Sequence, residues 1–348
     1  MSHNILITGA SGYLGGSLLA SWNQANLPPY QKLYALVRNE EQAKAVKELY
    51  GAEPVQIDLN NESDIKQAII SRDINIVYWM ISASEIRVPR IMIQALADVK
   101  KRTGTDAHFL FTSGAKVLSS HTGSPNDRPL LDTDPGLYEL QRTADGPQPF
   151  LNTGARTNAE VIDIAESYGV RSYIFVPCIV YGRGEGFGNP ISIQTVAIVR
   201  AAKRMQRMYT VDDSSASWPV CHLSDNTALF LDILRAILSG QIPNYGKNGF
   251  YLAASGSVKW HDLFGAMAKT LVKRGVIHDE SLTQADDAAL EQMAPVLQGV
   301  KSFVPAEIGG HCTLTAVNGH AIGWKAKYPP EHIFELAEEE VDWVLAHS

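Results

Sequence analysis

The chain has 348 residues, of which 45% are hydrophobic, and it carries a formal net charge of −7 with a pI near 5.8. A chain of this length buries a sizeable core, and its acidic balance argues against a nucleic-acid-binding surface or an anionic membrane as partner. No apolar run approaches the ~20 residues needed to span a bilayer, and the first residues lack the pattern of a signal peptide. The three cysteines are widely separated, as is typical of free thiols in a reducing compartment. We therefore expect a cytoplasmic protein.

The first predicted element is a short apolar strand that leads into a glycine-rich turn and then into a helix. Residues 4–16 read NILITGASGYLGG, and leucines then recur at helical spacing. Gly9, Gly12 and Gly15 form a TGxxGxxG pattern. In a dinucleotide site such glycines permit a tight turn, close approach of the pyrophosphate to the backbone, and close packing of the helix on the strand. The helix N-terminus then offers free N–H groups to the phosphates. A plain strand-to-helix turn could carry the same residues, but this context favours a cofactor site.

Apolar strands and amphipathic helices alternate through the rest of the first half. Each predicted strand is a nearly continuous apolar run, which indicates a parallel sheet covered by helices on both faces. The sequence therefore predicts an α/β fold of the doubly wound Rossmann type. The expected strands are 33–38, 54–59, 74–80, 109–112 and 172–177, and the expected helices are 40–50, 63–69, 91–99 and 153–169.

The alternation is interrupted at 119–149, where Gly, Pro, Asp, Thr and Ser dominate. A long loop of this kind is more often functional than accidental. Beyond residue 182 a smaller mixed α/β lobe is expected. It has helices at 193–207, 225–238, 259–274 and 331–345 and short strands at 220–223 and 250–253.

These patterns predict two domains. Residues 1–182, with a return segment at about 220–240, form the dinucleotide-binding domain, and residues 183–219 and 241–348 form a substrate-binding lobe. The acidic run 338–340 is interpreted as the solvated face of the last helix.

The order of motifs along the chain resembles the extended short-chain dehydrogenase/reductases, in the epimerase/dehydratase branch. The resemblance implies a Rossmann core, bound NAD(H) or NADP(H), and a small-molecule substrate under the second lobe. Relatives commonly pair through their fourth and sixth helices, so the resemblance is compatible with a homodimer but does not establish the oligomeric state. The motifs that carry the resemblance are TGASGYLGG at the start, Asp58-Leu59, FTSGA at 111–115, NAE at 158–160, VPCIVYG at 176–182 and VCHLSD at 220–225.

The end of the second strand bears on the choice of cofactor. An acidic residue there hydrogen-bonds the ribose 2′-OH of NAD, whereas an arginine accommodates the 2′-phosphate of NADP. This chain has Arg38 and no carboxylate before Glu40, which favours NADP(H) over NAD(H), although a merely solvated cation is the alternative. Asp58 either hydrogen-bonds the adenine amine or serves its own loop. The predicted cofactor-binding residues are Gly9, Ser11, Gly12, Tyr13, Leu14, Gly15, Arg38, Asp58, Leu59, Ser113, Arg156, Pro177, Ile179 and Val180.

The resemblance fails at the catalytic positions. The family uses a Tyr as proton donor or acceptor, a Lys four residues later that lowers the tyrosine pKa, and a Ser or Thr that polarises the substrate oxygen. The motif at 158–160 puts Asn152 at the Tyr position and Arg156 at the Lys position, and the motif at 111–115 puts Gly114 at the Ser position. Arg156 can still hold a ribose or phosphate, whereas Asn152 cannot deliver a proton near neutral pH.

Three other residues are candidates for the missing acid or base. Lys116 lies two residues past Gly114, in the loop that faces the nicotinamide in this family, Tyr138 lies in the long excursion, and His222 begins a segment that lines the pocket of relatives. Each has an ordinary alternative: a solvated loop cation, loop packing, and a hydrogen-bonded core residue, respectively. His311, Cys312 and His320 match no standard zinc spacing, so no metal site is predicted.

Three functions are compatible with these residues. The favoured one is an NADP(H)-binding enzyme that acts on a small carbonyl or hydroxyl compound with a non-standard acid/base arrangement. The alternatives are a redox-silent sensor of the cofactor, and a non-redox isomerase, lyase or cyclase in which the cofactor is structural. Fold-level analogy does not choose among them, because chemistry belongs to the site.

Overall fold

A parallel sheet runs through the amino-terminal half of the chain and takes in one strand from the other half. The structure is a computed structural model that describes residues 3–297 and 299–347. Within these residues, seven strands pair in the order β11-β7-β5-β4-β1-β2-β3, and every neighbouring pair is parallel. The strands are β1 (Asn4–Ile7), β2 (Lys32–Val37), β3 (Glu53–Gln56), β4 (Ile74–Trp79), β5 (His108–Thr112), β7 (Arg171–Pro177) and β11 (Phe250–Ala253).

The direction of winding reverses between β1 and β4, as the sequence predicts for a doubly wound Rossmann-type fold. β2 and β3 lie on one side of β1, and the later strands lie on the other. In such sheets, ligands bind in the crevice at the carboxyl ends of the strands at this switch point. The glycine turn follows β1 there.

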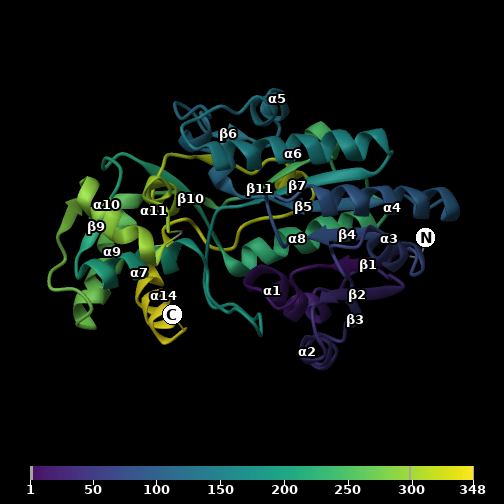
Figure 1. The fold of residues 1–348 in the computed structure, drawn as a ribbon, viewed down its shortest axis with the longest axis horizontal. Helices are drawn as coiled ribbons and strands as arrows, with labels where there is room; N and C mark the ends of the chain where they lie inside the picture. The colour runs from purple at the N-terminus through teal and green to yellow at the C-terminus, as the bar shows by residue number, and fades with distance from the viewer. Residues whose placement is uncertain (1–2, 298, 348) are drawn as a thin grey trace.

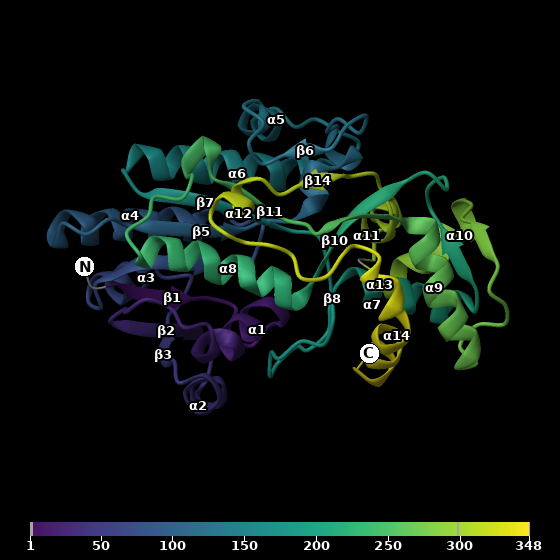
Figure 2. The same ribbon diagram turned by 180° about the vertical axis from the view of Figure 1, so that it is seen from behind.

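Helices cover both faces of the sheet (Figures 1 and 2), with α3, α4 and α6 on one face and α1 and α8 on the other. The central strands are accordingly buried, and all six residues of β4 are buried, whereas the edge strand β3 is largely exposed. The helices of this domain are α1 (Tyr13–Ser21), α2 (Glu40–Tyr50), α3 (Glu62–Ile70), α4 (Arg87–Thr103), α5 (Leu137–Arg142), α6 (Pro149–Ser167) and α8 (Leu223–Leu238).

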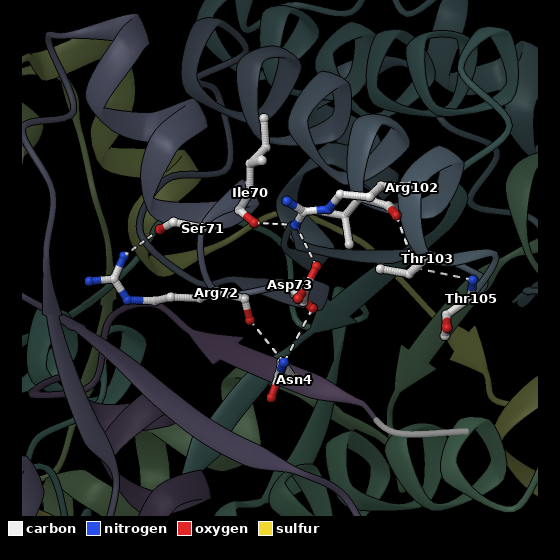
Figure 3. Close-up of polar contacts among 9 residues, drawn as sticks. Asn4, Ile70, Ser71, Arg72, Asp73, Arg102, Thr103 and Thr105 are labelled. Carbon is white, nitrogen blue, oxygen red and sulfur yellow. Dashed lines mark hydrogen bonds and ion pairs between the residues drawn. The ribbon is translucent and has the colours of Figure 1, made fainter.

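Hydrogen bonds at the amino-terminal end of β1 hold it to the α3–β4 turn (Figure 3). The side-chain amide of Asn4 donates to the carbonyl of Arg72 at 2.8 Å. Asp73 has a positive φ of 49° in this turn, and its carboxylate accepts from Arg102 of α4. These contacts set β1 beside β4, so that the two carboxyl ends meet at the switch point.

The smaller lobe lies beyond the carboxyl ends of the strands (Figures 1 and 2). Its sheet has the order β12-β10-β8, and β13 pairs with β9. Its strands are β8 (Ile179–Tyr181), β9 (Met208–Thr210), β10 (Ser217–His222), β12 (Gly256–Lys259) and β13 (Leu282–Gln284). Its helices are α7 (Gln194–Met205), α9 (Trp260–Lys273), α10 (Asp287–Met293), α11 (Val304–Ile308), α13 (His332–Glu335) and α14 (Ala337–His347).

Strand pairing places the return segment later than 220–240. β10 pairs in the small sheet, whereas β11 is the edge strand of the main sheet beside β7. Residues from the start of α8 to Ala253 therefore complete the Rossmann domain, because β11 needs α8 as its crossover. The short helix α12 (Asn318–Ala321) also packs against β11.

The excursion 119–149 is held at both sides rather than hanging free. It contains β6 (Leu130–Leu131), which pairs with β14 (Leu314–Thr315), and the helix α5, which packs on α6. The buried carboxylate of Asp132 accepts N–H bonds from Val317 and Asn318 at 2.8 and 2.9 Å. Burial nevertheless raises the pKa of Asp132.

The sequence prediction of free thiols is confirmed. Cys178, Cys221 and Cys312 are buried free thiols. Among the residues that the structure describes, no helix is both long and apolar enough to cross a membrane.

Candidate functional site

The three motif glycines of the turn after β1 have different tasks. Gly9 has a φ of +67°, and a Cβ there would lie 2.9 Å from the carbonyl oxygen of Met80. A Cβ on Gly15 would lie 2.3 Å from the carbonyl oxygen of Gly9, so only glycine lets α1 pack against the turn. Gly12 is the N-cap of α1, and a Cβ there would meet only the Gly9 oxygen, at 3.3 Å. Gly12 therefore leaves an open approach to the uncapped helix N-terminus, which suits a phosphate group.

A segment from the second half of the chain crosses this turn. We call residues 182–191 the glycine strap. The N–H groups of Gly188 and Asn189 donate to the carbonyl of Ser11 at 2.9 and 3.0 Å. A Cβ on Gly186 would lie 2.2 Å from the carbonyl oxygen of Gly12. The strap thus occupies the carbonyl side of the turn at van der Waals contact, which explains why this segment is rich in glycine.

The last helix holds the glycine strap at its two ends. The indole N–H of Trp343 donates to the carbonyl of Pro190 at 2.9 Å, and the Glu340 carboxylate accepts the N–H of Gly182 at 2.7 Å. Burial raises the pKa of Glu340, although the Gly182 bond partly offsets the effect. The expectation that 338–340 is a solvated face is therefore wrong for Glu340, which lies on the buried side of α14. Glu338 and Glu339 are exposed as expected.

A cavity of about 480 Å³ opens beside the turn, between the two domains. The start of α1, the loops after β4, β5 and β7, the start of α6 and two segments of the small lobe enclose it. Of the predicted cofactor residues, Tyr13, Leu14, Ser113, Pro177 and Val180 line it. The other lining residues are Ser82, Ala83, Ser84, Gly114, Ala115, Lys116, Val117, Phe150, Leu151, Gly154, Cys178, Ser192, Ile193, Gln194, Phe303 and Glu307.

Lys116 and Glu307 form an ion pair in the wall of this cavity. The Lys116 Nζ lies 2.6 Å from Glu307 Oε1, and the two side chains are 17% and 5% exposed. Lys116 belongs to the 3₁₀ turn Ala115–Leu118 after β5, whereas Glu307 belongs to α11 of the small lobe. Lys116 is thus the only proposed acid or base among Lys116, Tyr138 and His222 that lines the cavity within the described residues.

A chain of amide hydrogen bonds holds the Lys116 turn. Asn158 of α6 donates to the Gln141 side chain at 2.8 Å, and Gln141 donates to the carbonyl of Val117 at 2.8 Å. Both amide side chains are fully buried. Asn158, one of the residues that carry the family resemblance, therefore positions the backbone next to Lys116.

The Glu307 segment is docked on the same turn from the other lobe. The N–H of Ser120 donates to the carbonyl of His311 at 2.9 Å, and the N–H of His311 donates back to the Ser120 hydroxyl at 3.0 Å. Gly310 has a φ of +99°, and a Cβ there would lie 2.3 Å from the ring of His121. This close docking holds the Lys116–Glu307 pair together.

Ser113 supplies an unpaired polar atom at the floor of the cavity. Its hydroxyl is buried and has no hydrogen-bond partner among residues 3–297 and 299–347. A buried hydroxyl without a partner costs free energy unless a ligand or water satisfies it. Next to it, Gly114 is open, since a Cβ there would have nothing within 4 Å.

The structure gives the triad positions Asn152 and Arg156 other tasks. The Asn152 amide exchanges two hydrogen bonds with the backbone of Gly146, at 2.8 and 3.0 Å, and is 3% exposed. Arg156 is exposed and donates to the carbonyl of Ala144 at 2.7 Å. Neither residue lines the cavity, so both secure the end of the excursion instead.

Tyr138 and His222 also lie away from the cavity. The Tyr138 hydroxyl donates to Asp163 at 2.6 Å, and burial together with that carboxylate raises its pKa to about 12. His222 caps α8 through Ser224 and lines a separate cavity of about 360 Å³ with Tyr328 and His332. Burial lowers the pKa of His222. The ordinary alternatives, loop packing and a hydrogen-bonded residue, describe these two better than catalysis in the first cavity.

The residues predicted to hold the adenosine half lie at the ends of β2 and β3. The Arg38 guanidinium is exposed and makes no hydrogen bond or ion pair with any residue that the structure describes. Asp58 is exposed and accepts the N–H of Asn60 at 2.9 Å, as a loop residue does, while the carbonyl of Leu59 accepts from Arg87. Ile179 is buried in β8 and pairs with Val220 rather than lining the cavity.

Several lining residues were not anticipated from the sequence. The loop 82–84 follows β4, and the rule that ligands bind at the switch point could have found it. Glu307 carries no such signal, because it lies 191 residues from Lys116 on a helix of one turn.

Residues 1–175, half of the chain, match the NmrA-like family. The chain belongs to the NmrA-like family. This match, together with the structural neighbours below, confirms the resemblance to the extended short-chain dehydrogenase/reductases.

Solved structures that resemble this NmrA-like protein share its fold over nearly the whole chain. The dTDP-glucose 4,6-dehydratase from Bacillus anthracis, in complex with NAD, is 13% identical with a TM-score of 0.63 and covers 100% of this chain and 98% of its own. The UDP-glucose 4-epimerase from Thermotoga maritima is 15% identical with a TM-score of 0.60, covering 98% and 99%. Vestitone reductase from alfalfa is 17% identical with a TM-score of 0.56, covering 98% of both chains.

Proposed function

We propose that this protein is an NADP(H)-binding enzyme that reduces or oxidises a small carbonyl or hydroxyl compound, with Lys116 in place of the family tyrosine. The observation that carries the proposal is the Lys116–Glu307 pair in a cavity that adjoins the glycine turn. Enclosed cavities with few convergent polar groups are where small molecules bind. The NAD complex of the similar dehydratase supports a nicotinamide cofactor.

The residues present fit such a cofactor. Gly12 leaves the N-terminus of α1 open for the pyrophosphate, and the unpaired Ser113 hydroxyl awaits a hydrogen-bond partner at the nicotinamide end. The free guanidinium of Arg38 suits a 2′-phosphate, which supports NADP(H) rather than NAD(H). When bound, the nicotinamide supplies or accepts a hydride.

The side chains of the cavity supply the proton for this reaction. In the reducing direction, the Lys116 ammonium donates a proton to the substrate oxygen as negative charge develops there. Glu307 orients the ammonium and stabilises its charge before the transfer. A solvent proton then restores Lys116, and the oxidising direction runs through the same groups in reverse.

The decisive variant removes the pair without leaving a buried unpaired charge. Removing one partner alone exposes the other to an uncompensated desolvation cost, so Lys116→Met should be combined with Glu307→Gln. The double variant should bind NADPH as the wild-type chain does and lose about 10²–10⁴ of its turnover. Calorimetry with NADPH and absorbance at 340 nm with a panel of aldehydes and ketones measure the two effects. Unchanged turnover in the double variant would overturn the role of Lys116.

A second candidate is a redox-silent sensor. It is favoured by the engagement of Asn152 and Arg156 in loop contacts away from the cavity. A sensor binds NADPH with the affinity of an enzyme but oxidises none of it, whatever substrate is added. The wild-type protein in the same absorbance assay distinguishes the two functions.

A further inference from the structure

The charges in the wall of the cavity limit what it can hold. Of the described lining residues, only Lys116 and Glu307 carry a charge, and they neutralise each other at 2.6 Å. Proteins bind phosphates and carboxylates with arginine forks, lysines and helix N-termini. The helix N-terminus beside this cavity, that of α1, is the one proposed above to hold the cofactor pyrophosphate. An anion in this cavity would find its one cation already paired, and it would approach the Glu307 carboxylate in a poorly solvated space.

The rim of the cavity is apolar and unusually exposed. Phe150 at the start of α6 and Ile193 before α7 both line the cavity, yet their exposed fractions are 61% and 63%. Phe303, half-buried, packs edge-on against Phe150 with 5.8 Å between ring centroids. Large apolar side chains that converge from three separate segments at a cavity mouth indicate a binding site for an apolar molecule.

We propose that the substrate is a neutral, largely apolar molecule with a single carbonyl or hydroxyl group, and that sugar nucleotides are excluded. The inference rests on the proposed function and specifies its substrate class. The polar end of the substrate meets Lys116, and its apolar body leaves the cavity between Phe150 and Ile193. Two structurally similar proteins are named for sugar nucleotides, the substrate class that this proposal excludes for this chain.

A pair of probes that differ only in charge tests this class. Benzylideneacetone is a neutral aryl enone, and trans-cinnamate has the same shape with a carboxylate in place of the methyl ketone. Both, together with UDP-glucose, are titrated by calorimetry into the protein saturated with NADP⁺, which cannot donate a hydride to the enone. We expect the enone to bind at least about tenfold more tightly than cinnamate or UDP-glucose.

Polar substitutions at the rim locate the bound probe. Phe150→Ser and Ile193→Ser are expected to weaken enone binding about three- to tenfold each, because part of the apolar contact is lost. Both side chains are largely exposed, so the fold tolerates the change. Ile242→Ser is the matched control, since Ile242 has the same 63% exposure and does not line this cavity, and it should leave binding unchanged.

Cinnamate or UDP-glucose binding as tightly as the enone would overturn the substrate class, as would rim variants that bind the enone like the control. These results are separate from the test of the function. Reduction of NADP⁺ by UDP-glucose, with no turnover of the enone, would leave the oxidoreductase function standing and reject the substrate class. Tight enone binding without any turnover would reject the oxidoreductase function and leave the substrate class standing.

Discussion

The glycine turn and the Lys116–Glu307 pair line neighbouring parts of one site, but they are assembled in opposite ways. Consecutive residues Gly9–Gly15 shape the turn, and each motif glycine is explained by atoms within a few ångströms. The pair joins residues 191 positions apart and depends on the docking of two lobes. The glycine turn, which we call the nucleotide side of the site, is therefore formed by a local sequence motif. The Lys116–Glu307 pair, which we call the chemical side, is formed only by tertiary contacts between the two lobes. Substitutions on the two sides should have different consequences.

The largest effect is expected on the nucleotide side, at Gly12. Gly12→Val should abolish detectable NADPH binding, a loss of more than about a hundredfold, while the fold persists, because only one backbone atom crowds a Cβ there. Calorimetric titration and circular dichroism measure binding and folding. Gly265→Ala, in an open position of α9, is the control that should change neither. If Gly12→Val retained its affinity for NADPH, the glycine turn would not be the nucleotide-binding part of the site.

On the chemical side, restoring the family triad should fail at Asn152. Asn152→Tyr loses two hydrogen bonds to Gly146 and inserts a larger ring, which together should lower the free energy of unfolding by about 2–4 kcal/mol. Gly114→Ser, at an open position, should change it by less than about 0.5 kcal/mol. Denaturant titrations compare the two. A stable Asn152→Tyr variant with new reductase activity would show that this position can still serve catalysis and that the Asn152 bonds to Gly146 are dispensable.

Arg38 tests how far the nucleotide side extends. If its guanidinium holds the 2′-phosphate, Arg38→Ala should weaken NADPH binding by about 1.5–3 kcal/mol and leave NADH binding nearly untouched. Parallel titrations with both nucleotides measure this. Equal losses for NADPH and NADH would assign Arg38 another task.

The smallest effect concerns Glu340, which links α14 to the glycine strap. Its pKa in the folded protein is raised, so its contribution to stability is complete below the unfolded pKa and is lost as the pH rises through the folded value. Glu340→Gln keeps an acceptor for the Gly182 N–H without the charge. We expect this variant to gain up to about 1 kcal/mol over the wild type at pH 7 and nothing near pH 4. Thermal unfolding of both proteins at the two pH values measures this difference in stability. A stability difference that does not change with pH would contradict a raised pKa for Glu340.

The same contrast explains what the sequence could predict. The alternating strands, the glycine turn and the Rossmann-type sheet follow from local patterns, and the structure confirms them. The placement of β11 did not follow, because an edge strand of four residues reads alike in either domain. Asn152 was recognised as a departure from the family, but its bond to Gly146 depends on a loop conformation that no periodicity encodes.

The chemistry of the cavity was the least accessible to sequence reasoning. Lys116 could be named because it follows the fifth strand, whereas its partner Glu307 could not. The sequence does not show that the helix α5 places the Tyr138 hydroxyl against Asp163 and not in the cavity. Pairs of residues that form only by contact between the two lobes have no characteristic spacing in the sequence, so the sequence does not predict them.

The glycine strap also affects when the nucleotide site becomes complete during synthesis. Its contact with Tyr13 closes a loop of 169 residues, and its anchor at Trp343 closes another of 153. Contacts of such high sequence separation form late, because the entropy of closing the loop must be lost before the contact stabilises anything. In a nascent chain, the glycine turn therefore lacks the anchored glycine strap until α14 has left the ribosome. In a refolding reaction followed by NADPH fluorescence, nucleotide capture should be the last phase to appear.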